Sequence, residues 1–158
     1  MRDHALRVNG ESCKKAVQYL TDAMKKIRHE NNLDSLRGME GECASIYFGI
    51  FDELILNQKE AFCFNGRNKR PPLDNVNAML SFGYTLLAND CANALEGVGL
   101  DSYVGFLHRD RPGRKSLSLD LMEEMRAVLV DRFVLTLINN RQIQKEHFQT
   151  SESGAVEF

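Results

Sequence analysis

The residues best suited to chemistry lie in the stretch 105–126, which reads GFLHRDRPGRKSLSLDLMEEMR. His108 opens a loop rich in arginine and lysine, and a predicted helix with Asp120, Glu123 and Glu124 follows it. Residues three and four positions apart are neighbours on a helix, so these carboxylates would crowd together. An imidazole with carboxylates can hold a metal ion, and a basic loop can grip phosphates. The simpler interpretation stays open, because acids early in a helix also complement its dipole and face solvent.

A second unusual stretch is RGMEGECASIYF, in which Glu40 stands between Gly38 and Gly41 at the opening of a predicted helix. Glycine inside a helix costs up to about 1 kcal/mol relative to alanine. Two glycines beside one glutamate indicate either that something approaches the backbone closely or that helices pack tightly there. Spacing alone favours neither interpretation.

A third stretch, RNKRPP, places Arg67, Lys69 and Arg70 ahead of two prolines that stiffen the backbone. It is either a phosphate-contacting loop or a basic linker before a buried helix, and the linker is the default. The common signatures GxxxxGK[ST], GxGxxG, HExxH and GxSxG do not occur. Their absence removes the usual nucleotide-binding, zinc-protease and serine-hydrolase interpretations.

Composition limits the class of protein. The chain has 158 residues, 43% of them hydrophobic and 27% charged, as in one globular domain. The net charge of −2 gives no global attraction to nucleic acid, so any polyanion site must be local. No apolar stretch approaches the roughly 20 residues of a membrane span, and the start lacks a secretory signal. Four scattered cysteines without a CxxC pair suit a reducing compartment, so we expect a cytoplasmic protein without membrane contact.

Helical periodicity predicts the elements that must position these residues. One amphipathic helix covers 13–27, and a second, capped by Asp34 or Ser35, carries apolar residues along 39–54. Asp74 can cap a long helix to about Glu96, whose run AMLSFGYTLLA is apolar nearly all round and therefore predicted to be central and buried. Further helices run from about Ser116 into the late 120s and over 131–140, and the tail is irregular or weakly extended. We expect an all-α single domain over 1–158, with about six helices.

In the helix from Ser116, spacing places the apolar residues on one side and the acids on the other. The apolar side consists of Leu121, Met122, Met125 and Leu129.

Four stretches in order resemble one family. They are RGMEGECASIYF, NGRNKRPPLDNVNAMLSFGYTLL, VGLDSYVGFLHRDRPGRKSLSLDLMEEMR and VDRFVLTLINNRQI. They are similar to the C-terminal helical catalytic domain of the CRISPR-associated endonuclease and integrase Cas-one, in details that favour its type I-C branch. The resemblance covers about residues 10–158. The family's N-terminal β-rich domain is not represented, so we expect a catalytic-domain fragment.

The resemblance implies a metal site. The family's ligands fall on Glu40, His108 and Glu123, with Asp120 as an additional acidic position that orients ligands or substrate. Carboxylates suit hard cations and an imidazole shifts the preference towards manganese, which agrees with Mn²⁺ or Mg²⁺. The DNA-contacting arginines would then be Arg67, Arg70, Arg109, Arg111 and Arg114.

The resemblance also implies an activity and partners. A metal-dependent DNA endonuclease and integrase of CRISPR spacer acquisition would cleave and rejoin phosphodiesters, with spacer-precursor and repeat DNA as substrates. Homodimerisation and a Cas-two partner are expected of the full-length family. Two alternatives stay open. The chain is a truncated, non-catalytic helical fragment that binds DNA or protein, or it is a helical bundle whose charges serve only solvation.

Overall fold

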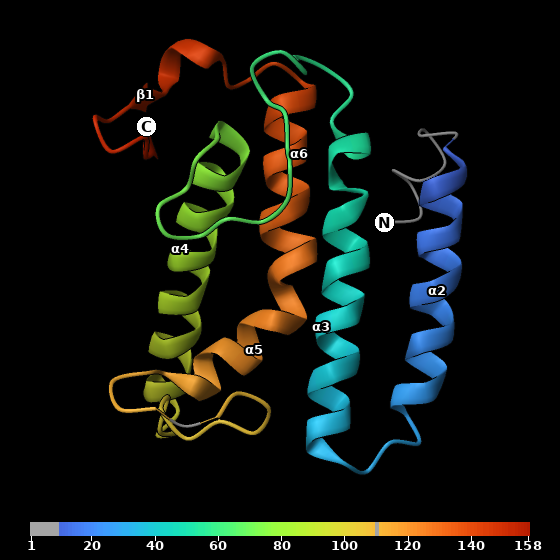
Figure 1. Cartoon of the computed structure of the whole chain (residues 1–158). Helices are drawn as coiled ribbons and strands as arrows, with labels where there is room; N and C mark the ends of the chain where they lie inside the picture. The colour runs from blue at the N-terminus through green and yellow to red at the C-terminus, as the bar shows by residue number, and fades with distance from the viewer. Residues whose placement is uncertain (1–9, 110) are drawn as a thin grey trace.

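The structure, a computed structural model, describes residues 10–109 and 111–158 and is mainly helical, as predicted (Figure 1). The α-helices are α2 (Glu11–Ile27), α3 (Leu33–Gly49), α4 (Asn75–Gly97), α5 (Ser116–Arg126) and α6 (Arg132–Asn139). Shorter elements are the 3-10 turns η1 (Phe51–Leu54) and η3 (Lys145–His147), the π-helical turn η2 (Ala127–Asp131), and strands β1 (Gln149–Thr150) and β2 (Val156–Glu157).

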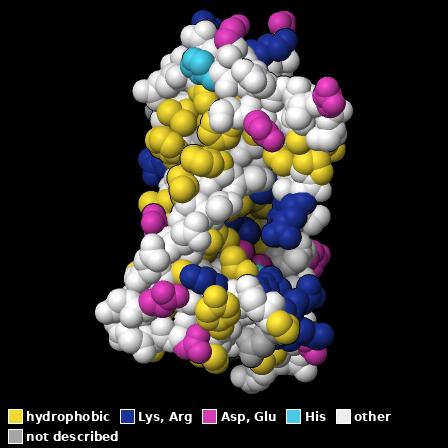
Figure 2. Space-filling view, turned by 90° about the vertical axis from the view of Figure 1, so that its left-hand side faces the viewer, with side chains coloured by type: hydrophobic (Ala, Val, Ile, Leu, Met, Phe, Trp, Pro, Cys, Tyr) yellow, Lys and Arg dark blue, Asp and Glu magenta, His cyan; other side chains and the backbone are white. Residues whose placement is uncertain are grey.

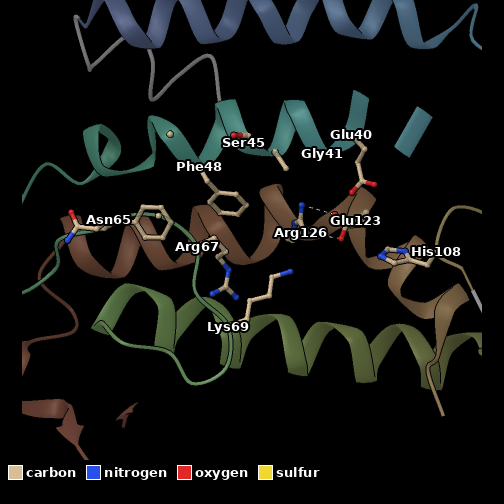
Figure 3. Close-up of a pocket in the computed structure, with 14 residues that line it drawn as sticks. Glu40, Gly41, Ser45, Phe48, Asn65, Arg67, Lys69, His108, Glu123 and Arg126 are labelled. Atoms are coloured by element: carbon tan, nitrogen blue, oxygen red, sulfur yellow. Dashed lines mark hydrogen bonds and ion pairs between the residues drawn. The ribbon is translucent and has the colours of Figure 1, made fainter. Parts of the chain in front are cut away.

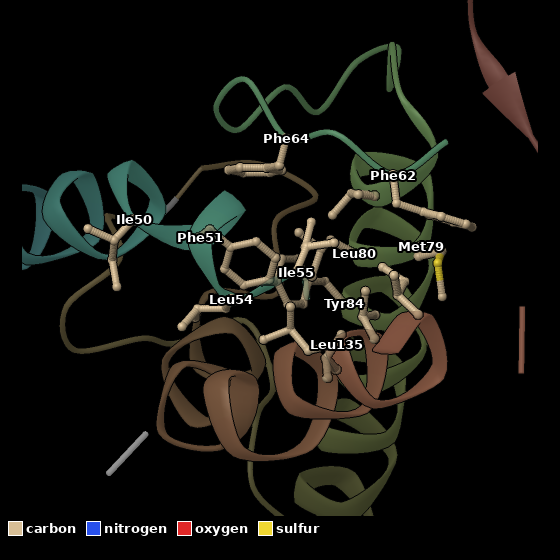
Figure 4. Packing of buried hydrophobic residues seen from close by; sticks show 14 of the residues in the cluster. Ile50, Phe51, Leu54, Ile55, Phe62, Phe64, Met79, Leu80, Tyr84 and Leu135 are labelled. Atoms are coloured by element: carbon tan, nitrogen blue, oxygen red, sulfur yellow. The ribbon is translucent and has the colours of Figure 1, made fainter. Parts of the chain in front are cut away.

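The core lies where the end of α3 and the turn η1 meet α4 and α6. Side chains that η1 and the following segment bring into it are fully buried, among them Phe51, Ile55 and Phe62. They pack with Leu80 of α4 and Leu135 of α6 (Figure 4). Helix α2 packs on α3 at one side of the molecule, whereas α5 crosses α4 (Figure 1).

The start of α3 differs from the sequence prediction. The Oδ1 atom of Asn32 accepts the backbone N–H groups of Asp34 at 2.9 Å and of Ser35 at 3.0 Å, so Asn32 is the cap. The prediction of Asp34 or Ser35 as the cap is wrong, because both lie inside the first turn. The cap predicted for α4 is confirmed, since Asp74 accepts the N–H of Asn77 at 2.7 Å.

Helix α4 is central but not buried on all sides. Phe82 and Leu86 are 53% and 50% exposed, so the prediction of burial all round is wrong for this face. The reason is that η2, α5 and α6 cover only part of the helix. At the covered face, a Cβ on Gly83 would lie 2.5 Å from Cγ1 of Val130, which requires glycine at this crossing.

The predicted helices at Ser116 and 131–140 form one continuous helical path through the π-helical turn η2. A π-helical turn changes the side-chain register of a helix. Met122 is buried, whereas Leu129, which the spacing places on the same apolar side, is 52% exposed. The tail forms the short antiparallel pair β1–β2, which confirms a weakly extended end.

Candidate active site

The three predicted metal ligands line one pocket of about 720 Å³. Glu40 comes from α3, His108 from the loop before α5, and Glu123 from α5, and their side chains are directed toward one another (Figure 3). The loop before α4 supplies the opposite wall. Residues lining the pocket include Gly41, Ser45, Phe48, Asn65, Arg67, Lys69 and Arg126.

Asp120 lies behind His108 and fixes its ring. The Nδ1 atom of His108 is 2.7 Å from Oδ1 of Asp120, which also accepts the backbone N–H of His108 at 3.0 Å. Burial raises the pKa of Asp120, but the hydrogen bonds from His108, Phe106 and Leu107 outweigh it and leave the pKa below its usual value. An ionised carboxylate only accepts, so Nδ1 carries the proton and the neutral ring has its lone pair on Nε2.

Glu123 is paired with Arg126 in the same pocket. The terminal nitrogens of Arg126 lie 2.9 Å from Oε1 and 2.8 Å from Oε2 of Glu123. Burial raises the pKa of Glu123 above its usual value, and the negative charge of Glu40 adds to this, although Arg126 opposes it. The pocket therefore holds two carboxylates that repel each other, a situation that a cation would relieve.

The donor set fits a hard or borderline divalent cation. Two carboxylates and an imidazole that a third carboxylate orients are the ligands and supporting contact that such ions take. Within residues 10–109 and 111–158, no three acidic, cysteine or histidine side chains stand close enough to hold a metal without moving. Both oxygens of Glu123 face Arg126 instead. Metal ligation by Glu40, His108 and Glu123 thus stays a prediction that requires side-chain movement.

The predicted arginines of the basic loop surround a second pocket of about 500 Å³. Glu40 and His108 line both pockets, so the second one adjoins the first. The carboxylate of Asp34 accepts hydrogen bonds from the guanidinium groups of Arg109 at 3.0 Å and of Arg37 at 2.7 Å. The Nε atom of Arg37 also donates to the backbone carbonyl of Leu107 at 2.6 Å. These contacts join α3 to both neighbours of His108. The predicted arginines in this pocket are Arg109, Arg111 and Arg114.

The two predicted arginines of RNKRPP lie in different environments. Arg67 lines the first pocket and donates to Asn77 Oδ1 at 2.6 Å and Ser81 Oγ at 3.1 Å, so it also fastens its loop to α4. Arg70 is exposed and lies outside both pockets. Lys69 lines the first pocket, and desolvation there, followed by the charges of Arg67 and Arg126, lowers the pKa of its ammonium.

The glycines beside Glu40 do not serve helix packing. Among residues 10–109 and 111–158, a Cβ on Gly38 or Gly41 would meet nothing within 4 Å. Gly41 lines the first pocket and Gly38 the second. The tight-packing interpretation is wrong, and the backbone of α3 is open to both pockets on either side of Glu40.

Three basic residues of these two pockets lie outside the set that the sequence predicted. Lys69 lies between the predicted Arg67 and Arg70, and Arg37 lies one turn before Glu40. Arg126 follows Glu123 by three positions, a spacing at which oppositely charged side chains meet on a helix. That spacing was the available signal for Arg126.

The family model described as CRISPR associated protein Cas1 matches residues 1–157. The chain belongs to the Cas1 family. Cas1 is the Cas-one family that the four sequence stretches resemble. Curated Cas1 endonucleases of Rhodospirillum rubrum and Chlorobaculum tepidum are 52% and 49% identical to it, each over 99% of the chain. The chain spans 46% of the length of either relative.

Solved structures share the fold, a Cas1 protein among them. A Cas1 protein from Thermotoga maritima has a TM-score of 0.76 and 34% identity, covering 87% of this chain and 43% of its own. A casposase bound to integration product has a TM-score of 0.77 and 29% identity, covering 98% and 42%. In the part of this Cas1 chain that the structure describes, no helix combines the length and apolar character of a membrane span.

Proposed function

We propose that this chain forms the metal-dependent nuclease and integrase domain of a Cas1 protein, acting on DNA in CRISPR spacer acquisition. The observation that carries the proposal is the meeting of Glu40, His108 and Glu123 in one pocket, although 83 positions separate the first from the last. The family membership and the names of the relatives support nuclease and integrase chemistry.

Glu40, Glu123 and the Nε2 atom of His108 would hold Mn²⁺ or Mg²⁺. When bound, such a cation polarises a phosphodiester and stabilises charge on its attacking and leaving oxygens. Asp120 keeps the proton on Nδ1 of His108, so that Nε2 is free to ligate. Arg67 and Lys69 bring positive charge to the opposite wall, where a phosphate oxygen can be bound and oriented.

DNA would pass over both pockets. Figure 2 shows one face of the molecule, on which lysine and arginine side chains gather beside a hollow in its lower half. Arg109, Arg111 and Arg114 surround the second pocket on the other side of Glu40 and His108, and Arg70 is exposed beyond the first. Contacts of this kind bind phosphates rather than bases, so affinity would depend strongly on salt and weakly on sequence.

The full-length protein would act together with other protein subunits. A partial Cas6-RT-Cas1–Cas2 complex resembles the chain with a TM-score of 0.73 and 31% identity, covering 90% of this chain and 43% of its own. We propose Cas2 and a second Cas1 subunit as partners of the full-length protein.

The test is cleavage and strand transfer on branched DNA in millimolar Mn²⁺, with wild type, His108→Ala and Glu123→Ala compared. The proposal predicts products from the wild type that both substitutions abolish. Products that persist in both variants contradict the site. Salt-dependent DNA binding without products would instead support the alternative of a non-catalytic binding fragment.

A further inference from the structure

Arg126 occupies the carboxylate that the proposed cation needs. It engages both oxygens of Glu123 at 2.8–2.9 Å, and Figure 3 shows the pair inside the pocket. Their side chains are only 19% and 20% exposed, so water and salt screen the pair less than at an open surface. A cation that binds Glu123 therefore competes with Arg126 for these two oxygens.

Arg126 also has a support that does not depend on Glu123. Its guanidinium carbon lies over the ring of Tyr84, 5.5 Å from the ring centre, within the range of a cation–π contact. The hydroxyl of Tyr84 donates to Asp131, a carboxylate only 1% exposed. Tyr47 donates to the other oxygen of Asp131 at 2.9 Å. The aromatic support of Arg126 is therefore anchored in the core.

The place where Tyr84 holds Arg126 is also where a phosphate would arrive. The guanidinium carbon of Arg67 lies over the same ring, 5.2 Å from its centre, and Lys69 lines the same pocket. A planar guanidinium can bind two oxygens of a phosphate as readily as two of a carboxylate. An Arg126 released from Glu123 would thus find a new anionic partner without leaving the ring of Tyr84.

We propose that Arg126 exchanges partners: it neutralises Glu123 in the metal-free chain and is released to a nucleic-acid phosphate when a divalent cation takes Glu123. The inference rests on the proposed function, since it requires Glu123 to be a ligand. It makes metal and DNA binding favour each other, because each removes a competitor of the other.

Calorimetric Mn²⁺ titration of the 158-residue chain tests whether Arg126 competes with the cation for Glu123. The variants are Arg126→Gln and Lys69→Gln. Lys69 lines the same pocket, and the described residues show no ion pair between it and Glu123. Lys69→Gln therefore measures the general gain from removing one positive charge. Arg126→Gln should bind Mn²⁺ about fivefold more tightly than Lys69→Gln, the scale of one partly exposed ion pair.

Equal affinities in the two variants, or weaker binding by Arg126→Gln, would overturn the exchange. Thermal melting shows whether Arg126→Gln folds. If it does not, Arg126→Lys replaces it, because lysine keeps the charge but cannot bind both oxygens as a planar fork. Arg126→Lys should then bind Mn²⁺ more tightly than the wild type, and unchanged binding would overturn the inference.

The affinity for fluorescent branched DNA, measured with and without Mn²⁺, tests whether the released Arg126 binds a nucleic-acid phosphate. Mn²⁺ should strengthen DNA binding by the wild type, and this gain should fall at least about threefold in Arg126→Gln. An equal gain in both proteins contradicts release of Arg126 to phosphate.

His108→Ala separates the two proposals. If Mn²⁺ binding is the same in His108→Ala as in the wild type, the proposed metal site is wrong and the exchange falls with it. If His108→Ala abolishes binding but Arg126→Gln fails to tighten it, only the exchange is wrong.

Discussion

The Nδ1 atom of His108 lies 2.7 Å from Oδ1 of Asp120, and the same carboxylate accepts the backbone N–H groups of Phe106, Leu107 and His108. One side chain of α5 thereby fixes both the histidine ring and the loop that carries it. A contact of this kind sets which ring nitrogen is free to bind a metal.

Asp120→Asn should weaken Mn²⁺ binding by about 10- to 100-fold, the usual effect of losing a residue that orients a metal-binding histidine. An asparagine amide cannot hold the His108 proton as the carboxylate does. Calorimetric titration measures the change, and Glu124→Gln, an exposed neighbour on the same helix, is the control. Equal Mn²⁺ affinity in Asp120→Asn and Glu124→Gln would show that Asp120 does not orient a ligand.

The carboxylate of Asp120 should make the free energy of unfolding depend on pH in the acidic range. The pKa of Asp120 in the folded chain lies below its ordinary value of 3.8, since hydrogen bonds from His108 and the loop outweigh the effect of burial. A carboxyl with a lowered pKa binds fewer protons when folded. The contribution of Asp120 to folding stability is therefore complete above its pKa in the unfolded chain. This contribution is lost as the pH falls through its pKa in the folded chain.

Urea unfolding at several pH values checks this linkage. At pH 6 the free energy of unfolding of the wild type should exceed that of Asp120→Asn by about 1–3 kcal/mol, the scale of hydrogen bonds to a charged group. The difference should narrow as the pH falls below 3.8. A difference that stays constant or widens in acid contradicts the lowered pKa.

Gly105→Ala should destabilise the chain by about 1–3 kcal/mol through overpacking. A Cβ there would lie 2.7 Å from Cβ of Ser116 and 2.9 Å from Oδ2 of Asp120. Gly38→Ala is the control, because its Cβ would meet no described residue within 4 Å, and it should stabilise α3 by up to about 1 kcal/mol. Urea unfolding compares the two. Similar effects of both substitutions would refute the close packing at Gly105.

Arg67→Ala and Arg70→Ala should separate support of the fold from DNA contact. Arg67→Ala removes hydrogen bonds to the buried Asn77 and to Ser81, and should cost about 1–3 kcal/mol of unfolding free energy. Arg70 is exposed, so Arg70→Ala should change stability by less than about 0.5 kcal/mol.

In DNA binding, Arg70→Ala should lower affinity evenly across sequences and reduce the slope of affinity against salt by about one. Fluorescence anisotropy at several salt concentrations measures that slope. An unchanged slope removes Arg70 from the set of phosphate contacts.

Local signals predicted much of the fold. Apolar spacing along 13–27 predicted α2, and Asp74 before an apolar run predicted the start of α4, because helix period and capping depend on neighbouring residues. The cap at Asn32 was not predicted because Asn31, Asn32, Asp34 and Ser35 lie within five residues and are all of types that cap helices. The exposure of Phe82 and Leu86 depends on how far other helices cover α4, which no local pattern contains.

The candidate site needed more than local signals. Spacing alone left Glu40 and His108 undecided, and only the ordered set of motifs related them to Glu123. The fold then brings all three to one pocket. The pairing of Arg126 with Glu123 was open to prediction from their three-residue spacing, whereas its contact with Tyr84 joins residues of two helices and required the structure.

The most direct test of the central claim is Mn²⁺ stoichiometry and affinity in the wild type and in Glu40→Gln, His108→Ala and Glu123→Gln. The metal site predicts one ion per wild-type chain and binding weakened by at least about 10-fold in each variant, since each loses one ligand. Glu124→Gln should bind like the wild type. Wild-type affinity in all three ligand variants would contradict a metal centre at these residues.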